Sequence, residues 1–437
     1  MKVAVVGYGI EGEQNYRYWT ARGDEVTIVD ERATPSRELP LGATTILGDG
    51  ALEKLGGFDL VVRTAGLAPT KLHTTAKLWS ATNEFFRQCP APIIGVTGSK
   101  GKGTTCSLVT SILRAAGYTV HLVGNIGIPA LEVLPDIETD HIVVYELSSF
   151  QLWDLERSPH QAAVLYIEPD HLDVHKDFAE YIGAKSNIVK FQSRTDICVY
   201  HPSNEWSLAI ARNQPDFTTH AAKYNTEQNG NDRLETVYVH DGMFVTTRGR
   251  KICPTNVVKL PGMFNLDNAS AAMSLCLSYE VDDGQFAQGL ADFTGLPHRL
   301  RFVAVKSDVK YYDDSIATTP GSAVAAVGAF VEPKVLILGG SSKGADFTGL
   351  AHALQDVHMR KILLIGSEAG VIAETFERED VKGYEIIDGT MQDVVARAQQ
   401  VAEPGDVVVL SPACASFGMF RDYKDRGDQF IDAVAAL

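Results

Sequence analysis

The sequence predicts an α/β protein made of parallel sheets covered by helices, divided into several domains. Short apolar runs rich in Val and Ile alternate with helix-length segments from end to end, which is the pattern of strands joined by crossover helices. The chain has 437 residues, and a single hydrophobic core rarely grows beyond about 250 residues. We therefore expect more than one α/β domain, and separate binding sites on them.

Composition excludes several classes of protein. The chain is 45% hydrophobic and 22% charged, and its formal net charge of −16 would repel nucleic acid or an anionic membrane. No apolar run approaches the roughly 18 residues that span a bilayer, so we expect a cytoplasmic protein. The cysteines contain no Cys-x-x-Cys pair and indicate reduced thiols rather than disulfides or a zinc site: Cys89, Cys106, Cys198, Cys253, Cys276 and Cys414.

The first α/β segment has expected strands at residues 2–7, 26–30 and 60–64. A Gly-x-Gly-x-x-Gly motif at residues 7–12 follows the first strand, and Asp30 ends the second, as in dinucleotide-binding domains. The motif also suits another diphosphate, such as a UDP-sugar, or a tight turn that binds nothing. A Pro-interrupted stretch at residues 88–92 predicts a domain boundary near residue 91.

A phosphate-binding loop is predicted after the strand at residues 93–96. The helix that follows has an apolar face at Leu108, Ile112 and Leu113 and ends at Gly117. Backbone amides, a helix N-terminus and a lysine at such a loop bind ATP or GTP. Gly103 stands where Ser or Thr normally follows the lysine, so Thr104 is expected to serve the metal. The loop residues are Gly98, Ser99, Lys100, Gly101, Lys102, Gly103, Thr104 and Thr105.

Metal partners for this loop are expected at the same edge of the sheet, where parallel strands end. Glu146 follows a strand at residues 141–145, and His171 follows one at residues 163–167. Lys185 falls within a predicted helix at residues 177–191; taken alone, it is interpreted as a solvated lysine. An Asn- and Thr-rich stretch around residues 225–232 predicts surface hairpins.

The last segment has expected strands at residues 335–338, 362–365, 384–387 and 407–410. Hydroxyls and a cation follow two of them, at residues 339–343 and 411–416, which suits a small substrate with a carboxylate. Arg299 and Asp314 flank the start of this segment, either as ligands or as a structural ion pair. The predicted domains are residues 1–90, 91–296 and 297–437.

Together these motifs resemble the Mur ligases over the whole chain. The matching stretches are residues 97–105, 124–127, 146–151, 170–171, 294–299, 339–347 and 410–416, with Phe420. The resemblance implies three domains: a Rossmann-like domain for the UDP end of the substrate, a central P-loop ATPase domain, and a C-terminal Rossmann-like domain for the amino acid. A uridine diphosphate then replaces the dinucleotide as the expected ligand of the first domain.

The resemblance also implies residue roles. Lys102, His171 and Lys185 would be catalytic, with Lys185 carbamylated; Thr104, Glu146, His171 and Lys185 would hold Mg²⁺, with two ions expected. ATP would contact residues 98–105 together with Asn265, Asn268, Arg299 and Asp314. The UDP substrate would contact Ile10, Glu11, Asp30, Arg32, Gly66, Asn125 and Gln151, and glutamate would contact Thr318, Lys343, Ser416 and Phe420.

The implied reaction joins D-glutamate to UDP-N-acetylmuramoyl-L-alanine through an acyl phosphate, in cytoplasmic synthesis of peptidoglycan precursors. ATP and Mg²⁺ would be required, the partners would be small molecules, and the protein would act as a monomer. Alternatives remain. A branch of the family that adds L-glutamate resembles the sequence around Ile316, and Gly103 is shared with folylpolyglutamate synthases. An oxidoreductase or a non-catalytic nucleotide-binding protein would fit only single motifs.

Two departures from the family pattern bear on the substrates. Ile316 stands where the family typically has a lysine, which removes a cation from the glutamate and phosphate region. Thr64 and Ala65 replace the usual Ser-Pro before Gly66, at the turn expected to meet the diphosphate. The first departure leaves the stereochemistry of the glutamate open.

Overall fold

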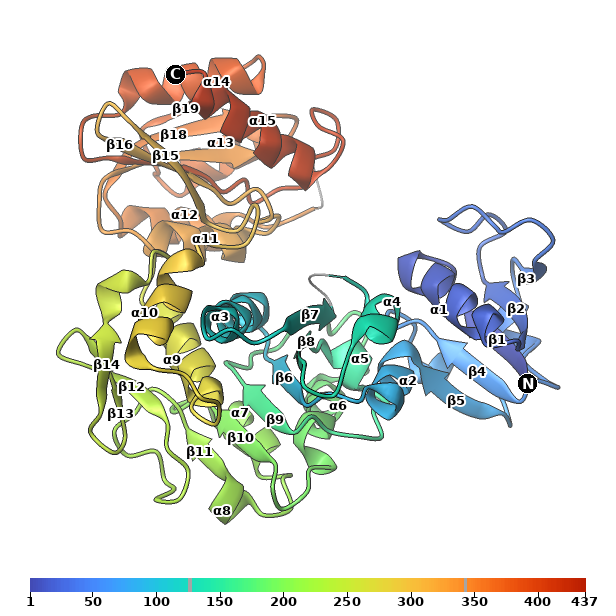
Figure 1. The fold of residues 1–437 in the computed structure, drawn as a ribbon. Coiled ribbons are helices and arrows are strands. Elements are labelled where there is room, and N and C mark those ends of the chain that lie inside the picture. Colours follow the sequence, from blue (N-terminus) through green and yellow to red (C-terminus); the bar gives the residue numbers. More distant parts are fainter. Residues whose placement is uncertain (125–127, 342–343) are drawn as a thin grey trace. The chain divides into compact units, whose positions relative to one another are not determined.

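A computed structural model describes residues 1–124, 128–341 and 344–437 (Figure 1). The described chain forms two compact units, one of Met1–Val257 with Leu266–Asp292 and the other of Val258–Asn265 with Phe293–Leu437. Parallel sheets flanked by helices make up most of both units, so the predicted α/β class is confirmed. The predicted boundaries at residues 90 and 296 stay predictions.

The first sheet of the first unit has five parallel strands in the order β3-β2-β1-β4-β5. They are β1 (Lys2–Val6), β2 (Glu25–Asp30), β3 (Thr44–Leu47), β4 (Leu60–Arg63) and β5 (Lys77–Ser80), with helices α1 (Ile10–Ala21) and α2 (Ala81–Gln88). Apolar side chains fill both faces; Val3, Val5 and two tryptophans, Trp19 and Trp79, pack on one of them. The strand order reverses at β1, which has β2 on one side and β4 on the other. The carboxyl ends of β1, β2 and β4 therefore form the edge where such sheets bind ligands.

The second sheet of this unit has six parallel strands in the order β11-β10-β9-β6-β8-β7. These are β6 (Ile93–Thr97), β7 (Val120–Gly124), β8 (Ile142–Glu146), β9 (Gln161–Val164), β10 (Ile197–Tyr200) and β11 (Ala221–Lys223). The helices are α3 (Lys102–Ala115), α4 (Ala130–Val133), α5 (Ser149–Leu152), α6 (Phe178–Lys190), α7 (Glu205–Ala211), α8 (Phe217–His220), α9 (Phe264–Cys276) and α10 (Asp283–Asp292). Helix α10 packs closely on α3, because a Cβ at Gly289 would collide with the backbone of Ile112.

The expected helices around the phosphate-binding loop and Lys185 are confirmed. Helix α3 ends at Ala115 and Gly117 has φ +89°, a left-handed conformation that glycine adopts at helix ends. Helix α6 begins after Asp177, whose side chain accepts a hydrogen bond from the Glu180 N–H as an N-cap. Strand β9 lies two residues earlier than expected, at Gln161–Val164, so a longer loop leads to His171.

The prediction of surface hairpins at residues 225–232 is wrong. The hairpins lie further on, in an antiparallel sheet of β12 (Val237–His240), β13 (Met243–Thr246) and β14 (Lys251–Pro254). Residues 225–232 form bends in which asparagines bind the backbone: Asn229 Nδ2 donates to Leu234 O at 2.7 Å and Asn231 Nδ2 to Ala221 O at 3.0 Å. Both asparagines are buried. Their amide side chains form the hydrogen bonds to backbone carbonyl oxygens that strand pairing would otherwise provide.

The second unit has one sheet in the order β15-β16-β20-β17-β18-β19. The strands are β15 (Arg301–Lys306), β16 (Val309–Asp313), β17 (Lys334–Gly339), β18 (Met359–Ile365), β19 (Tyr384–Ile386) and β20 (Val407–Leu410), and β15 alone runs antiparallel to its neighbour. The helices are α11 (Pro320–Gly328), α12 (Thr348–Gln355), α13 (Ala369–Arg378), α14 (Met391–Val401) and α15 (Tyr423–Ala435). Separate apolar clusters cover the two faces of the sheet, and the four strands expected from the sequence are confirmed.

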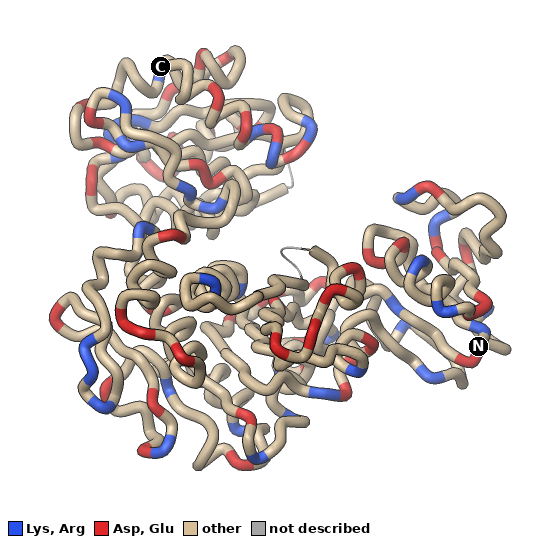
Figure 2. Tube along the Cα trace, in the orientation of Figure 1, with Lys and Arg blue, Asp and Glu red and all other residues tan. Residues whose placement is uncertain are grey.

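Three properties concern the described chain as a whole. All four tryptophans belong to the first unit: Trp19, Trp79, Trp153 and Trp206. Figure 2 shows basic and acidic residues interspersed along the trace of both units. Within residues 1–124, 128–341 and 344–437, no helix has both the length and the hydrophobicity needed to cross a membrane.

Candidate active site

The phosphate-binding loop joins β6 to α3 in a turn that only glycine fits at two points. Gly101, the N-cap of α3, has φ +84°, and a Cβ there would collide with Oδ1 of Asn268. A Cβ at Gly98 would lie 2.8 Å from Cβ of Leu165 and 3.0 Å from Lys100 O. The loop is therefore held tightly against β9 and α9, with the N-terminus of a 14-residue helix at its end. Unpaired amides and the helix dipole make such an end attractive to phosphate.

Two lysine side chains meet at this loop from different helices. Lys102 Nζ donates to Gly98 O at 2.8 Å and to Ser99 O at 3.1 Å. Lys185 Nζ donates to the same Gly98 O at 3.0 Å and to Thr97 Oγ1 at 3.2 Å. The carbonyl oxygen of Gly98 thus accepts hydrogen bonds from both amines, so α6, which carries Lys185, packs against the loop.

Lys185 is 1% exposed, so its interpretation from the sequence as a solvated lysine is wrong. Burial lowers the pKa of its amine well below the usual value and the nearby Lys102 cation lowers it further, while Asp170 and Glu146 act in the opposite direction. The main cause is that a buried ammonium group loses its hydration, and repulsion by the neighbouring cation adds to this cost. The surroundings of Lys185 therefore favour the neutral form of its amine.

The acidic residue expected at this edge of the sheet is in place. Glu146 is the last residue of β8, is 4% exposed, and pairs in register with Val96 of β6 and Gly124 of β7. Mg²⁺ prefers oxygen ligands, and a buried carboxylate beside a phosphate-binding loop and the first-turn hydroxyl of Thr104 fit that preference. The charges of Lys102 and Glu146 both act on Lys185, so the three side chains lie near one another; their roles at the site stay predictions.

His171 lies on the loop after β9, with φ +54° and a half-exposed side chain. Its ring centroid is 4.9 Å from that of Phe150, and its Nε2 is 3.6 Å from Oδ2 of Asp170. The left-handed backbone turns the chain sharply at this residue. Asp170 is a further acidic group here, because its charge acts on Lys185.

Ser99 and Lys100, predicted to bind ATP, also hold the loop in place. Ser99 Oγ donates to Glu168 O at 2.8 Å and lies 2.9 Å from the Tyr181 hydroxyl. Lys100 Nζ forms an ion pair with the Glu168 carboxylate at 2.8 Å. Their side chains tie the loop to the segment after β9, so a nucleotide would meet mainly the backbone at these two positions.

The two threonines at the start of α3 have different surroundings. Thr105 is fully buried, and its hydroxyl donates to Asn268 Oδ1 at 3.3 Å. Thr104 is partly exposed. It remains the proposed metal-binding hydroxyl, because Gly103 stands where Ser or Thr normally follows the lysine. Asn265 is buried and donates to Pro261 O at 2.7 Å, which fixes the chain at the start of α9.

The residues predicted to bind uridine surround the end of β1 and β2. Asp30 is 4% exposed and accepts hydrogen bonds from Tyr8 N at 2.7 Å, from Arg32 N at 2.9 Å and from the Arg32 guanidinium at 3.0 and 3.1 Å. Burial alone would raise the pKa of Asp30, but these hydrogen bonds outweigh it and the pKa is lowered. Ile10 is exposed, and Glu11 accepts the Ala65 N–H at 2.8 Å.

The turn after β4 contains Gly66, which is exposed and has open space where a Cβ would point. Gln151, in α5, forms a capping box with Ser148, because its Oε1 accepts the Ser148 N–H at 2.9 Å. The Nε2 amide of Gln151 is then the group that can donate to a ligand. Asn125, the other predicted contact to the muramoyl-alanine end, lies outside the described residues.

In the second unit, Asp314 follows β16 and is 6% exposed. Its carboxylate accepts the Leu300 N–H at 3.0 Å and the Ser411 hydroxyl at 2.8 Å. Burial raises its pKa to about 7, and the hydrogen bonds and the charge of Arg299 oppose this rise only in part. Arg299 is exposed, and its charge acts on Asp314; the interpretation of these two residues as ligands stays a prediction.

The predicted glutamate-binding residues differ in exposure. Thr318 is partly exposed, Ser416 is 3% exposed, and Phe420 is 7% exposed and belongs to an apolar cluster on one face of the sheet. Phe420 therefore packs as a core residue of the second unit. Lys343 lies outside the described residues.

Buried cations that the sequence did not reveal organise the loops of the site. Arg63 and Arg426 are both fully buried. Arg426 donates to Ser315 O at 2.7 Å, to Cys414 O at 3.1 Å and to Ala415 O at 3.2 Å. Neither arginine belongs to a phosphate-binding motif, so only the contacts in the folded chain reveal what they hold.

His175 was also missed. It is 2% exposed, its Nε2 lies 2.9 Å from Ser149 Oγ, and its ring centroid is 4.1 Å from that of Trp153. Burial lowers the pKa of His175, against the opposing charge of Glu180. The spacing of four residues after His171 was a signal in the sequence, since it places both imidazoles in one loop.

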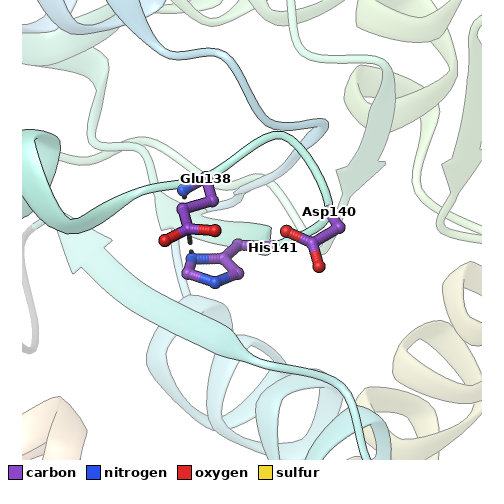
Figure 3. Close-up of side chains that lie close together, drawn as sticks. All are labelled: Glu138, Asp140 and His141. Atoms are coloured by element: carbon purple, nitrogen blue, oxygen red, sulfur yellow. Dashed lines mark hydrogen bonds between the residues drawn. The ribbon is translucent and has the colours of Figure 1, made fainter.

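A separate group of side chains that can bind metals lies in the turn before β8 (Figure 3). Glu138, Asp140 and His141 each offer one ligand atom within 4.8 Å of the others. The Nδ1 of His141 already accepts the Glu138 N–H at 3.1 Å and lies 3.0 Å from Nε2 of His121. Both carboxylates are exposed, and exposed acidic groups commonly occur without an ion, so this group is assigned no function.

Comparison with known proteins agrees with this geometry. The chain matches the Mur ligase middle domain over residues 96–276 and the Mur ligase glutamate ligase domain over residues 298–414. A UDP-N-acetylmuramoylalanine--D-glutamate ligase of Clostridium botulinum (strain Loch Maree / Type A3) is 33% identical, covering 100% of this chain and 97% of the relative. A protein of the same name from Symbiobacterium thermophilum is 36% identical, with 100% and 98% covered.

Solved structures share the fold. A MurF ligase of Thermotoga maritima in complex with ADP has a TM-score of 0.59 at 16% identity, and the match covers 98% of this chain and 93% of that one. At this identity the likeness concerns the fold alone. The identity to the full-length relatives is high enough to show the family: the chain belongs to the Mur ligases, which are ATP-dependent ligases.

Proposed function

We propose that this protein joins D-glutamate to UDP-N-acetylmuramoyl-L-alanine at the expense of ATP, in the synthesis of peptidoglycan precursors. The name of the full-length relatives supports the substrates. One structural observation supports the chemistry: the amines of Lys102 and Lys185 meet at Gly98 O, at the sheet edge where Glu146 ends β8. Cations and a buried carboxylate at one phosphate-binding loop are the groups that phosphoryl transfer needs.

In the first step the carboxylate of the alanine attacks the γ-phosphate of ATP, an oxygen–phosphorus bond forms, and ADP leaves. Both reactants are anions. Lys102, now bonded to Gly98 O and Ser99 O, would move to the phosphates, and the N-terminus of α3 would stabilise their charge. Mg²⁺ held by Thr104 and Glu146, with His171 nearby, would neutralise further charge on the phosphates.

In the second step the amino group of glutamate attacks the acyl carbon. The tetrahedral intermediate loses phosphate and a proton, and an amide remains. The residues proposed to hold glutamate are Thr318, Lys343, Ser416 and Phe420, and those proposed to hold ATP on the second unit are Asn265, Arg299 and Asp314. Because Phe420 lies in the core, its role would be to support the neighbouring Ser416 rather than to contact the substrate.

The proposal includes carbamylation of Lys185. The neutral amine attacks carbon dioxide, a nitrogen–carbon bond forms, and one proton is released to leave a carbamate anion. Complete burial and the adjacent Lys102 favour the neutral amine that this step requires. The product is an anion where a protonated lysine would have been a second cation beside Lys102, which suits a site that must bind Mg²⁺.

For the UDP end, the proposed contacts are Ile10, Glu11, Asp30, Arg32 and Gly66, with Asn125 and Gln151 at the muramoyl-alanine end. The Asp30 carboxylate already accepts four hydrogen bonds from Tyr8 and Arg32. The oxidoreductase alternative is disfavoured because the chain belongs to a family of ATP-dependent ligases. A folylpolyglutamate synthase-like activity is disfavoured because the relatives match the whole chain, N-terminal sheet included.

The stereochemistry of glutamate is the finer part of the proposal. Ile316, where the family typically has lysine, is partly buried directly before Ala317 and Thr318. The missing cation leaves L-glutamate as the second candidate. The monomeric state and the cytoplasmic location stay predictions.

The test uses the purified protein with ATP, Mg²⁺ and UDP-N-acetylmuramoyl-L-alanine, with D-glutamate or L-glutamate added separately. Phosphate release and product mass are followed together. Product with D-glutamate alone supports the proposal, and product with L-glutamate alone replaces it by the second candidate. Phosphate release that does not depend on glutamate contradicts both.

A further inference from the structure

Arg63, the last residue of β4, has an unusually complete set of contacts. Its side chain is fully buried, and Nε and Nη2 bind the Asp154 carboxylate at 2.7 and 2.6 Å. Nη2 also donates to Phe150 O at 2.8 Å. Nη1 donates to the carbonyl oxygens of Thr64, Ala65 and Leu67 at 3.3, 3.1 and 3.2 Å.

These contacts join two segments that are distant in the sequence. One is the turn at residues 64–67, after β4, and the other is α5 with Asp154 behind it. A guanidinium has five N–H donors in a fixed plane, and here each of its nitrogens has a partner. Arg63 therefore fixes both the shape of the turn and its position against α5.

The turn is held on its amide side as well. Glu11 Oε2 accepts the Ala65 N–H at 2.8 Å, and Thr64 O accepts the Leu67 N–H at 3.0 Å. Between these amides lies Gly66, with no atom within 4 Å of the position of a Cβ. The protein packs tightly on one side of the turn and leaves the other side open.

From this arrangement we infer that Arg63 is a positioning residue for the UDP-linked substrate: it sets the turn at Gly66 at a fixed distance from Gln151 on α5. The inference rests on the proposed function, in which Gly66 meets the diphosphate and Gln151 the muramoyl-alanine end. A substrate that spans both segments loses affinity or alignment when their spacing is free to vary, since small misplacements of binding groups are costly.

Conservative variants test this inference. Arg63→Lys keeps a cation beside Asp154 but cannot supply the planar set of donors. Asp154→Asn keeps the shape but removes the charge pair. The matched control is Glu156→Gln, because Glu156 also pairs with the N-terminal sheet, at 3.2 Å from Lys77, yet both of those side chains are 53% exposed.

Steady-state kinetics with each substrate varied gives the first readout. We expect kcat/KM for UDP-N-acetylmuramoyl-L-alanine to fall by about tenfold to a hundredfold in Arg63→Lys and Asp154→Asn, while KM for ATP stays within about twofold. Glu156→Gln should resemble the wild type. An equal fall in kcat/KM for all substrates in Arg63→Lys, or no fall for any of them, would overturn the inference.

Hydrogen–deuterium exchange of the protein without substrates gives a second readout that does not depend on the reaction. Arg63→Lys should exchange faster than the wild type at residues 64–67 and in α5, and Glu156→Gln should not. Unchanged exchange in both segments would overturn the inference even if the enzyme were slower. If the wild type forms no amide with either glutamate, the proposed function fails, while the exchange experiment still decides whether Arg63 holds the two segments.

Discussion

Burial lowers the pKa of the Lys185 amine, and the proposed function assigns to this residue a carbamate formed with carbon dioxide. Lys185→Ala should reduce activity by at least about a hundredfold, because it removes the proposed carbamate from the metal site. A short-chain carboxylate such as acetate should restore part of the activity by replacing the carbamate, whereas bicarbonate should not. Phosphate-release assays with and without acetate measure this.

The control for Lys185 is Lys190→Ala, an exposed lysine on the same helix. It should retain activity within about twofold, since surface substitutions away from a site have small effects. Turnover by Lys185→Ala at the wild-type rate would refute the assignment of Lys185 to the catalytic group.

Asp314 makes stability depend on pH in a definite direction. Burial raises its pKa from the ordinary value of 3.8 to about 7 in the folded protein, so the folded state binds the proton more tightly than the unfolded state. The resulting stabilisation is fully present below about pH 4 and is lost as the pH rises to about 7. Asp314→Asn keeps the shape and removes the titration. The difference in unfolding free energy between variant and wild type should shift in favour of the variant by on the order of 3 kcal/mol across this range.

Denaturant titrations followed by circular dichroism, at about pH 5 and about pH 7.5, measure this difference. Asp308→Asn is the control, because Asp308 is exposed in the turn between β15 and β16. A difference between Asp314→Asn and the wild type that does not change with pH would contradict the prediction.

Gly66 separates the needs of the fold from those of the ligand. Its φ is not in the left-handed region, and a Cβ would meet no atom within 4 Å. Gly66→Ala should therefore change the unfolding free energy by less than about 0.5 kcal/mol. If a diphosphate approaches this backbone, the added methyl group should raise KM for the UDP substrate by about tenfold or more. An unchanged KM would remove Gly66 from the proposed contacts.

Among the elements, those with a local signal were predictable from the sequence. The phosphate-binding loop was found because Gly98, Gly101 and Lys102 lie close together between a strand and a helix. The Asn-rich stretch near Asn229 predicts hairpins wrongly, since asparagines favour turns whether or not strands follow. The hairpin of β12 and β13 has a local signal of its own, the dipeptide Asp241-Gly242, which forms its two-residue turn with φ of +47° and +71°.

Contacts between elements could not be predicted in the same way. Lys185 looked like a surface residue because nothing near it in the sequence shows that α6 passes beneath Gly98. Arg63 looked like the end of an ordinary strand, and its partner Asp154 is 91 residues away. Charged residues that hold loops in place are identified by burial and pairing, and both depend on the tertiary fold.

Arg426, on α15, ties the turn after β16 to the loop after β20 by donating to carbonyl oxygens of both. Burial lowers its pKa to about 10, so it remains charged at neutral pH. Arg426→Met leaves these carbonyl oxygens without that donor and should destabilise the second unit by on the order of 3 kcal/mol. Because the same loops carry Thr318 and Ser416, KM for glutamate should also rise.

Thermal unfolding and glutamate titrations test Arg426→Met. The control is Arg421→Met, since Arg421 pairs with Asp425 at 3.3 Å but is 86% exposed, and exposed pairs contribute less than about 1 kcal/mol. Equal destabilisation by the two substitutions would show that the buried contacts of Arg426 hold the loops no better than a surface ion pair.

For the whole molecule, the alternation of strands and helices predicted the class of fold, and the order of the motifs along the chain predicted the family. The limits of the compact units were harder to predict, because residues 258–265, which lead into α9 and include its first two residues, pack with the second unit. A boundary defined by packing need not follow the chain, and a sequence pattern that resets near residue 295 gives only part of it.

The placement of the four tryptophans in the first unit makes intrinsic fluorescence a selective reporter. Tryptophan emission at about 340 nm should follow the unfolding of that unit alone, while the ellipticity follows the unfolding of both units. The two melting curves should therefore not superimpose if the units unfold separately. Superimposable curves would show one cooperative molecule. Trp153, whose ring lies 4.1 Å from that of His175 beside α5, should in addition respond to the UDP-linked substrate and remain silent to glutamate alone. The protein thus carries a label-free probe that can order the arrival of its substrates.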